Sequence, residues 1–570
     1  MQTRNLAEKL SVSSQLTPPD LTAAAHQGIR SIINNRPDAE ASDQPTSAEI
    51  EAATTALGLG YRHIPVVPGQ IHDEDIANFS VALAELEAPV LAFCRTGTRS
   101  ASLWALSAPA EVASSDLLAA ARAAGYDLDA LKPRLDTRRQ AATHSAGRPR
   151  AAAQRHDVVI IGGGAAGLAT AASLLRRRPG LDIAVIEPAD RHFYQPGWTL
   201  VGCGVFSAND TMRPMASIMP KGVRWQRSAV EAFEPEHDRI VLADGTRLAY
   251  RVLVAAPGLK LNWGAIPGLE EALGKNGVTS NYRFDLAPYT WELVQKLERG
   301  TALFTQPPLP IKCAGAPQKA MYLSCDHWRR ADRIGDIDVE FHIAGDVLFG
   351  VKEYVPALMH YIERYGIDLK FESNLVGVNG PAREATFAMK RPNGSLQEVT
   401  RRFDLLHVCP PQTAPDFVRS SPLAGDAGWI EVDHQTLRHT RLENVFSLGD
   451  VCSAPNTKTA AAARRQAPIV AENVLAVLAS NEPRAIYDGY GSCPLTVERG
   501  RIVLAEFGYG GKLLPTFPKW VIDGTRPSRL AWLLKERILP LVYWQGMLKG
   551  REWLAAPHIN SPMSDTPELG

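Results

Sequence analysis

The stretch Asp157-Val158-Val159-Ile160-Ile161-Gly162-Gly163-Gly164-Ala165-Ala166-Gly167 decides the fold of the larger part of this chain. Its apolar first half predicts a buried strand, its glycines a tight turn, and the alanine-rich sequence that follows a helix. Gly162 permits the turn, Gly164 leaves room for a pyrophosphate, and Gly167 lets the helix pack closely on the strand. Ala166 lies with them at the helix start. The pattern predicts a Rossmann-type unit that binds a dinucleotide at the helix N-terminus.

Two further features indicate which dinucleotide binds. The second strand, Ile183–Ile186, ends at Glu187, whose carboxylate accepts from ribose hydroxyls and repels a 2′-phosphate. Far downstream, a strand ends in Gly449 and Asp450, and a helix follows Lys458 and Thr459. This resembles the late motif of two-dinucleotide flavoproteins, in which the aspartate holds the ribityl chain. Together the two motifs predict FAD.

The place where an NAD(P)H site is expected lacks its motif. Residues 339–344 read as a strand, but Val347 stands where the second glycine of a phosphate-binding turn belongs, and Asp346 repels a pyrophosphate. Electrons are therefore expected to enter from another substrate and leave to another acceptor.

Composition limits the remaining choices. The chain of 570 residues is long enough for about three domains, and 45% hydrophobic with 21% charged residues is typical of a globular protein. Its formal charge of zero gives nucleic-acid binding no support. Seven cysteines indicate reactive thiols in a reducing compartment. No leader, spanning helix or metal site is predicted, and the oligomeric state is left open.

The predicted fold class is α/β: a Rossmann-type flavoprotein with two dinucleotide-binding domains, preceded by a small phosphatase-like α/β domain. Residues 1–131 form that first domain, and residues 132–155 form an arginine- and alanine-rich linker. Residues 156–510 form the FAD-dependent oxidoreductase, with a degenerate second Rossmann-like subdomain. Residues 511–570 form a C-terminal segment that contacts membrane and quinone.

Three stretches carry a family resemblance: HFYQPGWTLVG at 192–202, KCAGAPQK at 312–319 and DGYGSCPL at 488–495. They closely resemble sulfide:quinone oxidoreductase, of the type that includes the mitochondrial animal enzyme, and the likeness covers about residues 155 to 555. The resemblance implies that FAD takes two electrons from sulfide and passes them to a membrane quinone. One departure is 256–258, Ala-Pro-Gly here and usually Ala-Thr-Gly in the family.

The resemblance also implies the roles of two cysteines, Cys313 and Cys493, as a disulfide or sulfur-bridged pair beside the flavin. Sulfide attacks the sulfur on Cys493 and leaves a persulfide, and the released Cys313 thiolate reduces the flavin. A glutathione-like thiol, sulfite or sulfide then accepts the sulfane sulfur. Lys312 either lowers the Cys313 pKa or is a solvated side chain. The other cysteines of this part, Cys203, Cys325, Cys409 and Cys452, are expected to be buried and inert.

The C-terminal residues 526–554 mix tryptophan, leucine and basic residues, which suits a helix lying at a membrane interface and broken in two by Pro540. An ordinary packed amphipathic helix is the alternative. Because a lipid-soluble quinone must be reached, we predict a cytoplasmic protein attached peripherally to the inner face of the cell membrane.

Near the N-terminus, Cys94-Arg95-Thr96-Gly97-Thr98-Arg99 follows a predicted strand and enters a helix. Cys94 is expected to be a low-pKa thiolate, with Arg99 closing its loop. The Cys-x4-Arg spacing is one residue shorter than that of cysteine phosphatases and looks like rhodanese, whereas residues 31–37 resemble the tyrosine-phosphatase-like fold. We predict bifunctional sulfide oxidation with sulfur transfer through a Cys94 persulfide. The alternatives are an NADH dehydrogenase of the same fold, and an N-terminal cysteine phosphatase or docking module.

Overall fold

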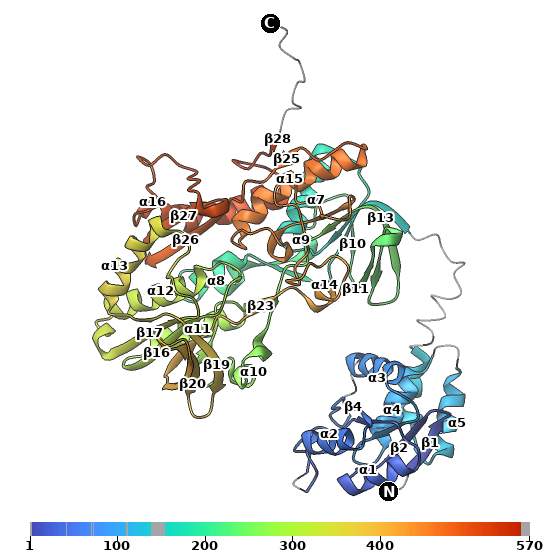
Figure 1. The fold of residues 1–570 in the computed structure, drawn as a ribbon. Coiled ribbons are helices and arrows are strands. Elements are labelled where there is room, and N and C mark those ends of the chain that lie inside the picture. The colour runs from blue at the N-terminus through green and yellow to red at the C-terminus, as the bar shows by residue number, and fades with distance from the viewer. Residues whose placement is uncertain are drawn as a thin grey trace. The chain divides into compact units, whose positions relative to one another are not determined.

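A computed structural model describes residues 3–41, 43–69, 71, 73–109, 112–137, 139 and 154–559 of the chain. The chain divides into two compact units, Met1–Ala151 and Ala152–Gly570 (Figure 1).

The first unit is a five-stranded sheet with the order β1-β2-β5-β3-β4. Only β1 runs antiparallel to its neighbour. All side chains of β3 and β5 are buried, as expected for central parallel strands. The strands are β1 (Thr3–Ala7), β2 (Leu10–Ser13), β3 (Ser31–Asn34), β4 (Gly60–His63) and β5 (Val90–Phe93), and the helices are α1 (Pro18–His26), α2 (Ser47–Ala56), α3 (Asp73–Glu85), α4 (Thr98–Ser107) and α5 (Ser114–Ala123).

Part of the predicted linker packs on this first unit. Leu135 is buried in its core, and the Arg134 guanidinium donates to the Ile71 carbonyl at 2.7 Å. The first unit therefore extends past residue 131, because the residues after it supply both an apolar and a polar contact. Residues 138 and 140–153 of the predicted linker lie outside the described residues, and residues 154 and 155 begin a strand of the second unit.

The second unit opens with the strand, turn and helix that the glycine motif predicts. Strand β6 (Gln154–Ile161) lies between β7 (Ile183–Ile186) and β13 (Arg247–Ala255), and all three run parallel. The sheet is completed by β10 (Val223–Gln226), β11 (Val230–Glu234), β12 (Arg239–Leu242) and β24 (Val445–Ser447). Helix α7 (Ala165–Arg177) packs beside α15 (Ala460–Leu478), and Arg177 joins them through Glu472 at 2.7 Å (Figure 1).

A second parallel sheet has the order β15-β22-β16-β17-β18. The chain runs from β16 (Gly300–Gln306) through α12 (Ala316–Arg330) to β17 (Ile337–Ile343), then through α13 (Val355–Tyr365) to β18 (Asp368–Lys370). The sheet is completed by β15 (Val278–Thr279) and β22 (Leu405–His407). Strand β16, rather than β17, is thus the first strand of this Rossmann-like unit. A dinucleotide turn would lie between β16 and α12, where the chain reads Pro-Pro-Leu-Pro-Ile-Lys-Cys-Ala-Gly instead.

Two small antiparallel elements accompany this sheet. The hairpin β26 (Gly491–Glu498) and β27 (Arg501–Phe507) packs against α12. A three-stranded sheet is formed by β19 (Ser373–Asn379), β20 (Glu384–Lys390) and β21 (Leu396–Arg402).

The C-terminal segment is helical without interruption from Arg529 to Lys549, which corrects the break expected at Pro540. Two π-helical turns, η10 (Leu534–Ile538) and η11 (Val542–Gly546), flank the short helix α17 (Leu539–Leu541) that holds this proline. Proline lacks the backbone N–H of a regular helix, and its ring crowds the preceding turn. The wider π-helical turns on either side accommodate both effects. Helix α16 (Arg529–Leu533) begins the segment and η12 (Met547–Lys549) ends it. Just beyond, Glu552 pairs with Arg177 and accepts from Ser173 at 2.5 Å, which ties the segment to α7.

Candidate active site

The glycine loop between β6 and α7 forms an open cradle. A Cβ on Gly167 would lie 1.9 Å from the Gly162 carbonyl oxygen, so only glycine lets the helix approach the strand here. A Cβ on Gly164 would meet nothing within 4 Å. The space before the α7 N-terminus is therefore free for a pyrophosphate, as the sequence predicts. Gly162, at φ 97°, packs against the Ala256 carbonyl of the unusual Ala-Pro-Gly turn.

Glu187 lies beside this cradle at the end of β7. Its carboxylate accepts from the Gly163 N–H at 2.7 Å and from the Ala189 N–H at 2.8 Å. These bonds fix the carboxylate next to the glycine loop, where a ribose would reach it.

The second predicted cofactor segment lies on the same sheet. Gly449 has φ 76°, and its N–H donates to Gln466 at 2.8 Å. Thr459 caps α15 by accepting from the Ala462 N–H at 3.2 Å. Burial raises the pKa of the half-buried Asp450 carboxyl, an effect that Lys312 and Lys458 oppose. The residues around Asp450 thus combine an acid with a helix N-terminus, which fits the ribityl and pyrimidine end of FAD.

The structure brings together the two cysteines that are 180 residues apart in the sequence. The Cys313 and Cys493 sulfurs lie 3.9 Å from each other and are both free thiols. Cys313 lies in the loop before α12 with φ 50°, a strained conformation for a side-chain-bearing residue. Cys493 lies in β26 and is fully buried. Two sulfurs in contact can exchange a bond without a large movement of the backbone.

The cysteine loop is attached to the predicted FAD segment through the backbone. The Cys313 N–H donates to the Lys458 carbonyl at 2.9 Å, and Lys312 forms a β-bridge with Lys458. The thiol pair is therefore held beside the segment that carries Asp450 and Thr459.

The lysine that acts on Cys313 is Lys319, which the sequence analysis missed. Its ammonium lies 3.1 Å from the Cys313 sulfur. Lys312 instead reaches Gln195 and lies 5.7 Å from the centre of the Trp198 ring. A hydrogen bond from the Cys493 thiol, with the charge of Lys319, lowers the pKa of Cys313 well below its usual value. Six residues along, in the first turn of α12, Lys319 points back at the loop, a position that Cys-x5-Lys spacing would have indicated.

A second missed residue is Lys535, which the C-terminal segment places inside the unit. It is 3% exposed and donates to the Pro196 carbonyl at 3.3 Å. Burial and the charge of Lys319 lower its pKa to about 7, and the two thiols act in the opposite direction. No sequence signal distinguished this lysine from the surface cations around it.

The remaining cysteines of the unit are buried, as predicted. Burial raises the pKa of the Cys203 and Cys409 thiols to about 12 and also raises that of Cys325 and Cys452. The Cys452 thiol donates to the Gly449 carbonyl at 3.3 Å. These thiols remain protonated at neutral pH and are poor nucleophiles.

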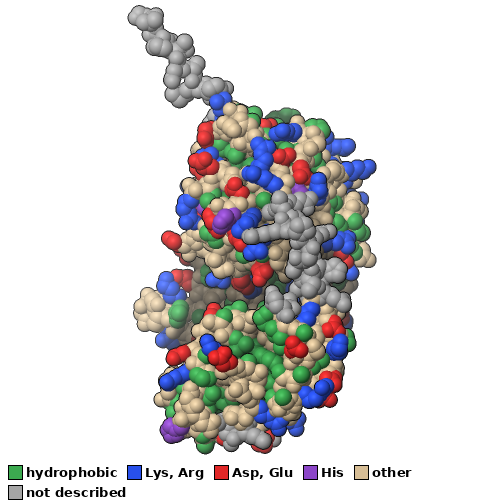
Figure 2. Space-filling view, turned by 90° about the vertical axis from the view of Figure 1, so that its right-hand side faces the viewer, with side chains coloured by type: hydrophobic (Ala, Val, Ile, Leu, Met, Phe, Trp, Pro, Cys, Tyr) green, Lys and Arg blue, Asp and Glu red, His purple; other side chains and the backbone are tan. Residues whose placement is uncertain are grey.

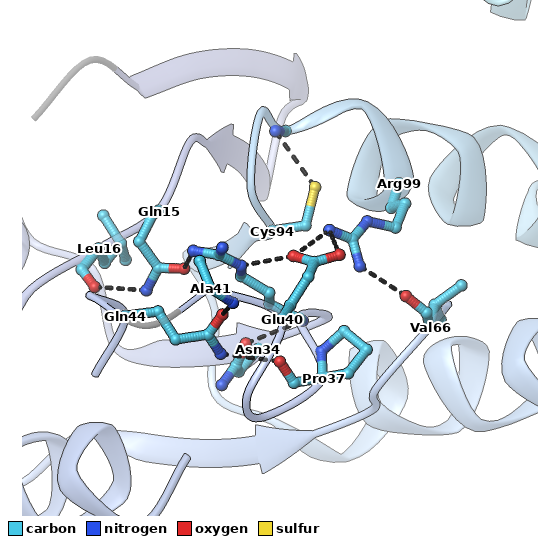
Figure 3. A network of polar contacts seen from close by, with 12 residues as sticks. Gln15, Leu16, Asn34, Pro37, Glu40, Ala41, Gln44, Val66, Cys94 and Arg99 are labelled. Atoms are coloured by element: carbon cyan, nitrogen blue, oxygen red, sulfur yellow. Dashed lines mark hydrogen bonds and ion pairs between the residues drawn. The ribbon is translucent and has the colours of Figure 1, made fainter. Parts of the chain in front are cut away.

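In the first unit, Cys94 lies at the end of β5 and before α4. It is fully buried and accepts the Gly97 N–H at 3.2 Å. Arg99, which was expected to close the loop, donates to the Val66 carbonyl at 2.6 Å and pairs with Glu40 at 2.8 Å (Figure 3). The same Glu40 pairs with Arg36 at 2.5 Å. The sequence analysis did not select Glu40, and it included Arg36 only within the stretch 31–37.

Two protein families match separate parts of the chain. Residues 156–294 match the pyridine nucleotide-disulphide oxidoreductase family, and residues 2–111 match the phosphatase-like domain of beta-lactamase hydrolase-like protein. The larger unit is thus an FAD-dependent oxidoreductase of the two-dinucleotide type, preceded by a phosphatase-like domain. Over 391 residues the chain is 40% identical to the mitochondrial sulfide:quinone oxidoreductase of Dictyostelium discoideum, covering 68% of this chain and 84% of that one. The chain belongs to the sulfide:quinone oxidoreductase family.

Two further relatives match parts of the chain. The structure of the sulfide:quinone oxidoreductase from Aquifex aeolicus shares the fold, with a TM-score of 0.57, 19% identity, and coverage of 69% of this chain and 92% of that one. The beta-lactamase hydrolase-like protein of Xylella fastidiosa (strain Temecula1) is 39% identical over 107 residues, which are 19% of this chain and 25% of that one.

Proposed function

We propose that the larger unit oxidises sulfide to sulfane sulfur with FAD and passes the electrons to a quinone. The observation that carries this proposal is the contact between the Cys313 and Cys493 sulfurs, with Lys319 on one of them. The backbone bond from Cys313 to Lys458 holds that pair beside the FAD segment.

The residues fit a balanced cycle that starts from a bond between the two cysteines. Hydrosulfide attacks the Cys493 sulfur, the bond to Cys313 breaks, and a persulfide on Cys493 and a thiolate on Cys313 result. Lys319 stabilises this thiolate by its charge and hydrogen bond. Bound FAD supplies a two-electron acceptor that can return the pair to a quinone. Once a thiol, sulfite or sulfide has taken the outer sulfur, the freed Cys493 thiolate re-forms the bond to Cys313, and the two electrons that this oxidation releases would pass to that two-electron acceptor.

Anaerobic bleaching of the bound flavin by sulfide tests this function. The wild type should bleach rapidly and recover on addition of quinone, whereas Cys313→Ser and Cys493→Ser should not bleach. Bleaching by NADH but not by sulfide would instead establish the NADH dehydrogenase alternative.

We also propose that the first unit moves sulfane sulfur through Cys94. The thiolate attacks the outer sulfur of a persulfide donor, whose S–S bond breaks, so that Cys94 gains the persulfide and the donor leaves as a thiolate. The Gly97 N–H directed at the sulfur supports a negative charge there. Loss of persulfide sulfurtransferase activity in Cys94→Ser tests this. Phosphatase turnover that dies in the same variant, without sulfur transfer, would favour the phosphatase alternative.

A third proposal concerns attachment to the cytoplasmic face of the membrane. Leu530, Leu533, Ile538 and Leu541 are 44–62% exposed and follow helical spacing, so they form one outward stripe, which we call the C-terminal apolar stripe. Basic residues such as Arg526 and Arg537 lie in the same segment and are exposed. An apolar stripe with cations suits a helix at the lipid interface, within reach of a quinone. Among the described residues, no helix is long and apolar enough to cross a bilayer.

A further inference from the structure

The buried ion-pair cluster beside Cys94 carries an inference about which sulfur donors the first unit accepts, and this inference rests on the proposed sulfur transfer. Two cations, Arg36 and Arg99, share one carboxylate, Glu40, at 2.5 and 2.8 Å. Their side chains are 6%, 11% and 13% exposed, respectively. The cluster is therefore part of the interior of the unit rather than a surface ion pair.

The sheet topology explains why this cluster lies at the thiol. Strands β3 and β5 are parallel neighbours, with Asn34 opposite Phe93, so their carboxyl ends meet at one edge. Cys94 follows one strand and Arg36 the other, and the Asn35 N–H donates to the Phe93 carbonyl at 2.8 Å. Ser100 of α4 donates to the Asn35 side chain at 2.8 Å and locks the two edges together.

The loop after β3 is shaped to return Glu40 to this edge. Ala39 has φ 59°, the left-handed conformation that favours glycine, and so turns the chain back. Gln44 holds the loop by donating to the Pro37 carbonyl at 2.7 Å and accepting from the Ala41 N–H at 3.2 Å. Figure 3 shows the Glu40 carboxylate reaching Arg99, with Cys94 on the adjacent loop.

The charges of the cluster determine what it can bind. Burial acts to raise the pKa of Glu40, but hydrogen bonds from Arg99 and Arg36 prevail and lower it, so the carboxylate is ionised at neutral pH. Two positive charges and one negative charge leave one net positive charge. The donors of Arg99 that would grip an oxyanion already serve Glu40 and the Val66 carbonyl. A dianion would have to displace a buried carboxylate.

We propose that Glu40 is a charge filter that keeps dianions such as phosphate monoesters and thiosulfate out of the Cys94 site. The substrate class left to the site is a low-molecular-weight persulfide, whose reacting group carries a single negative charge. This assigns specificity to a residue outside the cysteine loop and gives a phosphatase-like fold a means of excluding phosphate.

The direct test is calorimetric binding of inorganic phosphate to the full-length protein. Cys94→Ser should bind phosphate weakly, and Cys94→Ser/Glu40→Gln should bind it at least tenfold more tightly. The control Cys94→Ser/Glu85→Gln removes a surface partner of Arg62, at 2.8 Å, and should match Cys94→Ser. Equal phosphate affinity in the Glu40 variant and its parent would overturn the filter. Circular dichroism verifies that each variant is folded, and Glu40→Ala, with no hydrogen-bonding side chain, should show the same gain in affinity.

A second measurement separates this inference from the sulfur-transfer proposal. With Cys94 intact, Glu40→Gln should raise the ratio of kcat/KM for thiosulfate to kcat/KM for a glutathione persulfide at least tenfold. Tighter phosphate binding in a protein that transfers no sulfur would support the filter and end the transfer proposal. Normal sulfur transfer with unchanged phosphate affinity and an unchanged ratio of kcat/KM values would overturn the charge filter and leave the sulfur-transfer proposal standing.

Discussion

The ammonium of Lys319 lies 3.1 Å from the sulfur of Cys313, and the helix α12 that carries it begins only three residues after that cysteine. This cation thus adds to the hydrogen bond that the Cys313 sulfur receives from the Cys493 thiol. The two effects lower the pKa of Cys313 well below its usual value, whereas the pKa of Cys493 is raised by its hydrogen bond to Cys313 and by burial. The asymmetry supports the proposed roles of the pair, with Cys313 as the electron donor and Cys493 as the sulfur carrier.

Replacing Lys319 by methionine should slow flavin reduction by sulfide about tenfold or more at pH 7. The lysine helps to lower the Cys313 pKa, so its loss raises that pKa. Once the pKa lies above the working pH, each further pKa unit reduces the thiolate fraction about tenfold. Because the thiolate returns at higher pH, the deficit should shrink as pH rises. Stopped-flow reduction from pH 6 to 9 measures it. Lys319→Arg is the control, and a deficit that is constant with pH would argue against this role.

Lys535 should matter most on the acid side of neutrality. Its pKa is lowered to about 7, so its positive charge near the thiols is present below that pH and lost above it. Lys535→Met should therefore reduce kcat/KM for sulfide several-fold at pH 6 and hardly at all at pH 8.5. Removing a buried, sparsely paired charge should not lower the thermal midpoint. An equal loss of kcat/KM at pH 6 and pH 8.5 would show that Lys535 acts through packing and not through its charge.

The C-terminal apolar stripe should control membrane binding. Leu533→Glu with Leu541→Glu removes two leucines that are 49% and 62% exposed, so each can contribute about 1 kcal/mol on burial of its remaining surface in lipid. Co-sedimentation with anionic liposomes should fall more than tenfold, while bleaching by sulfide is retained. The control is Leu396→Glu in β21, where the side chain is 71% exposed and outside the stripe. Unchanged sedimentation of the double variant would show that another surface binds lipid.

The two glycines of the cofactor loop should fail in different ways. Gly164→Val fills space that the protein leaves open, so the variant should fold as stably as the flavin-free wild type yet hold at least tenfold less FAD. Gly167→Ala places a Cβ 1.9 Å from the Gly162 carbonyl oxygen and should lower the midpoint of the flavin-free protein itself. Flavin absorbance and thermal unfolding distinguish the two outcomes. Full flavin content in Gly164→Val would show that the pyrophosphate of FAD does not bind next to Gly164.

The sequence predicted best what depends on short-range pattern. The strand–glycine–helix unit at residues 157–172 and the burial of four spare cysteines are local properties, and both are confirmed. The face in Figure 2 carries intermingled acidic and basic side chains, in keeping with the formal charge of zero. The contact between Cys313 and Cys493 was inferred from a family likeness, because nothing local relates residues 180 apart.

The features that the sequence analysis missed depend on the three-dimensional orientation of side chains and on local helix geometry. Lys312 and Lys319 flank the same motif, and the position of Lys319 in the first turn of α12, which its spacing from Cys313 could have indicated, brings it to the thiol. Glu40 pairs with Arg99 across 59 residues through a loop turned by Ala39. Pro540 sits inside a helix because two widened turns accommodate it, which composition does not encode.

The tie between Arg177 and Glu552 has a consequence for biosynthesis. Helix α7 is translated early, but the partner that covers its end is made 375 residues later. Contacts so distant along the chain form slowly and late, since a large loop must close before they are gained. On the ribosome, the end of the nucleotide-binding helix that Glu552 covers therefore stays exposed until the segment around Glu552 has been made. Removing the residues from Glu552 onward should thus harm cofactor retention at the distant start of this unit.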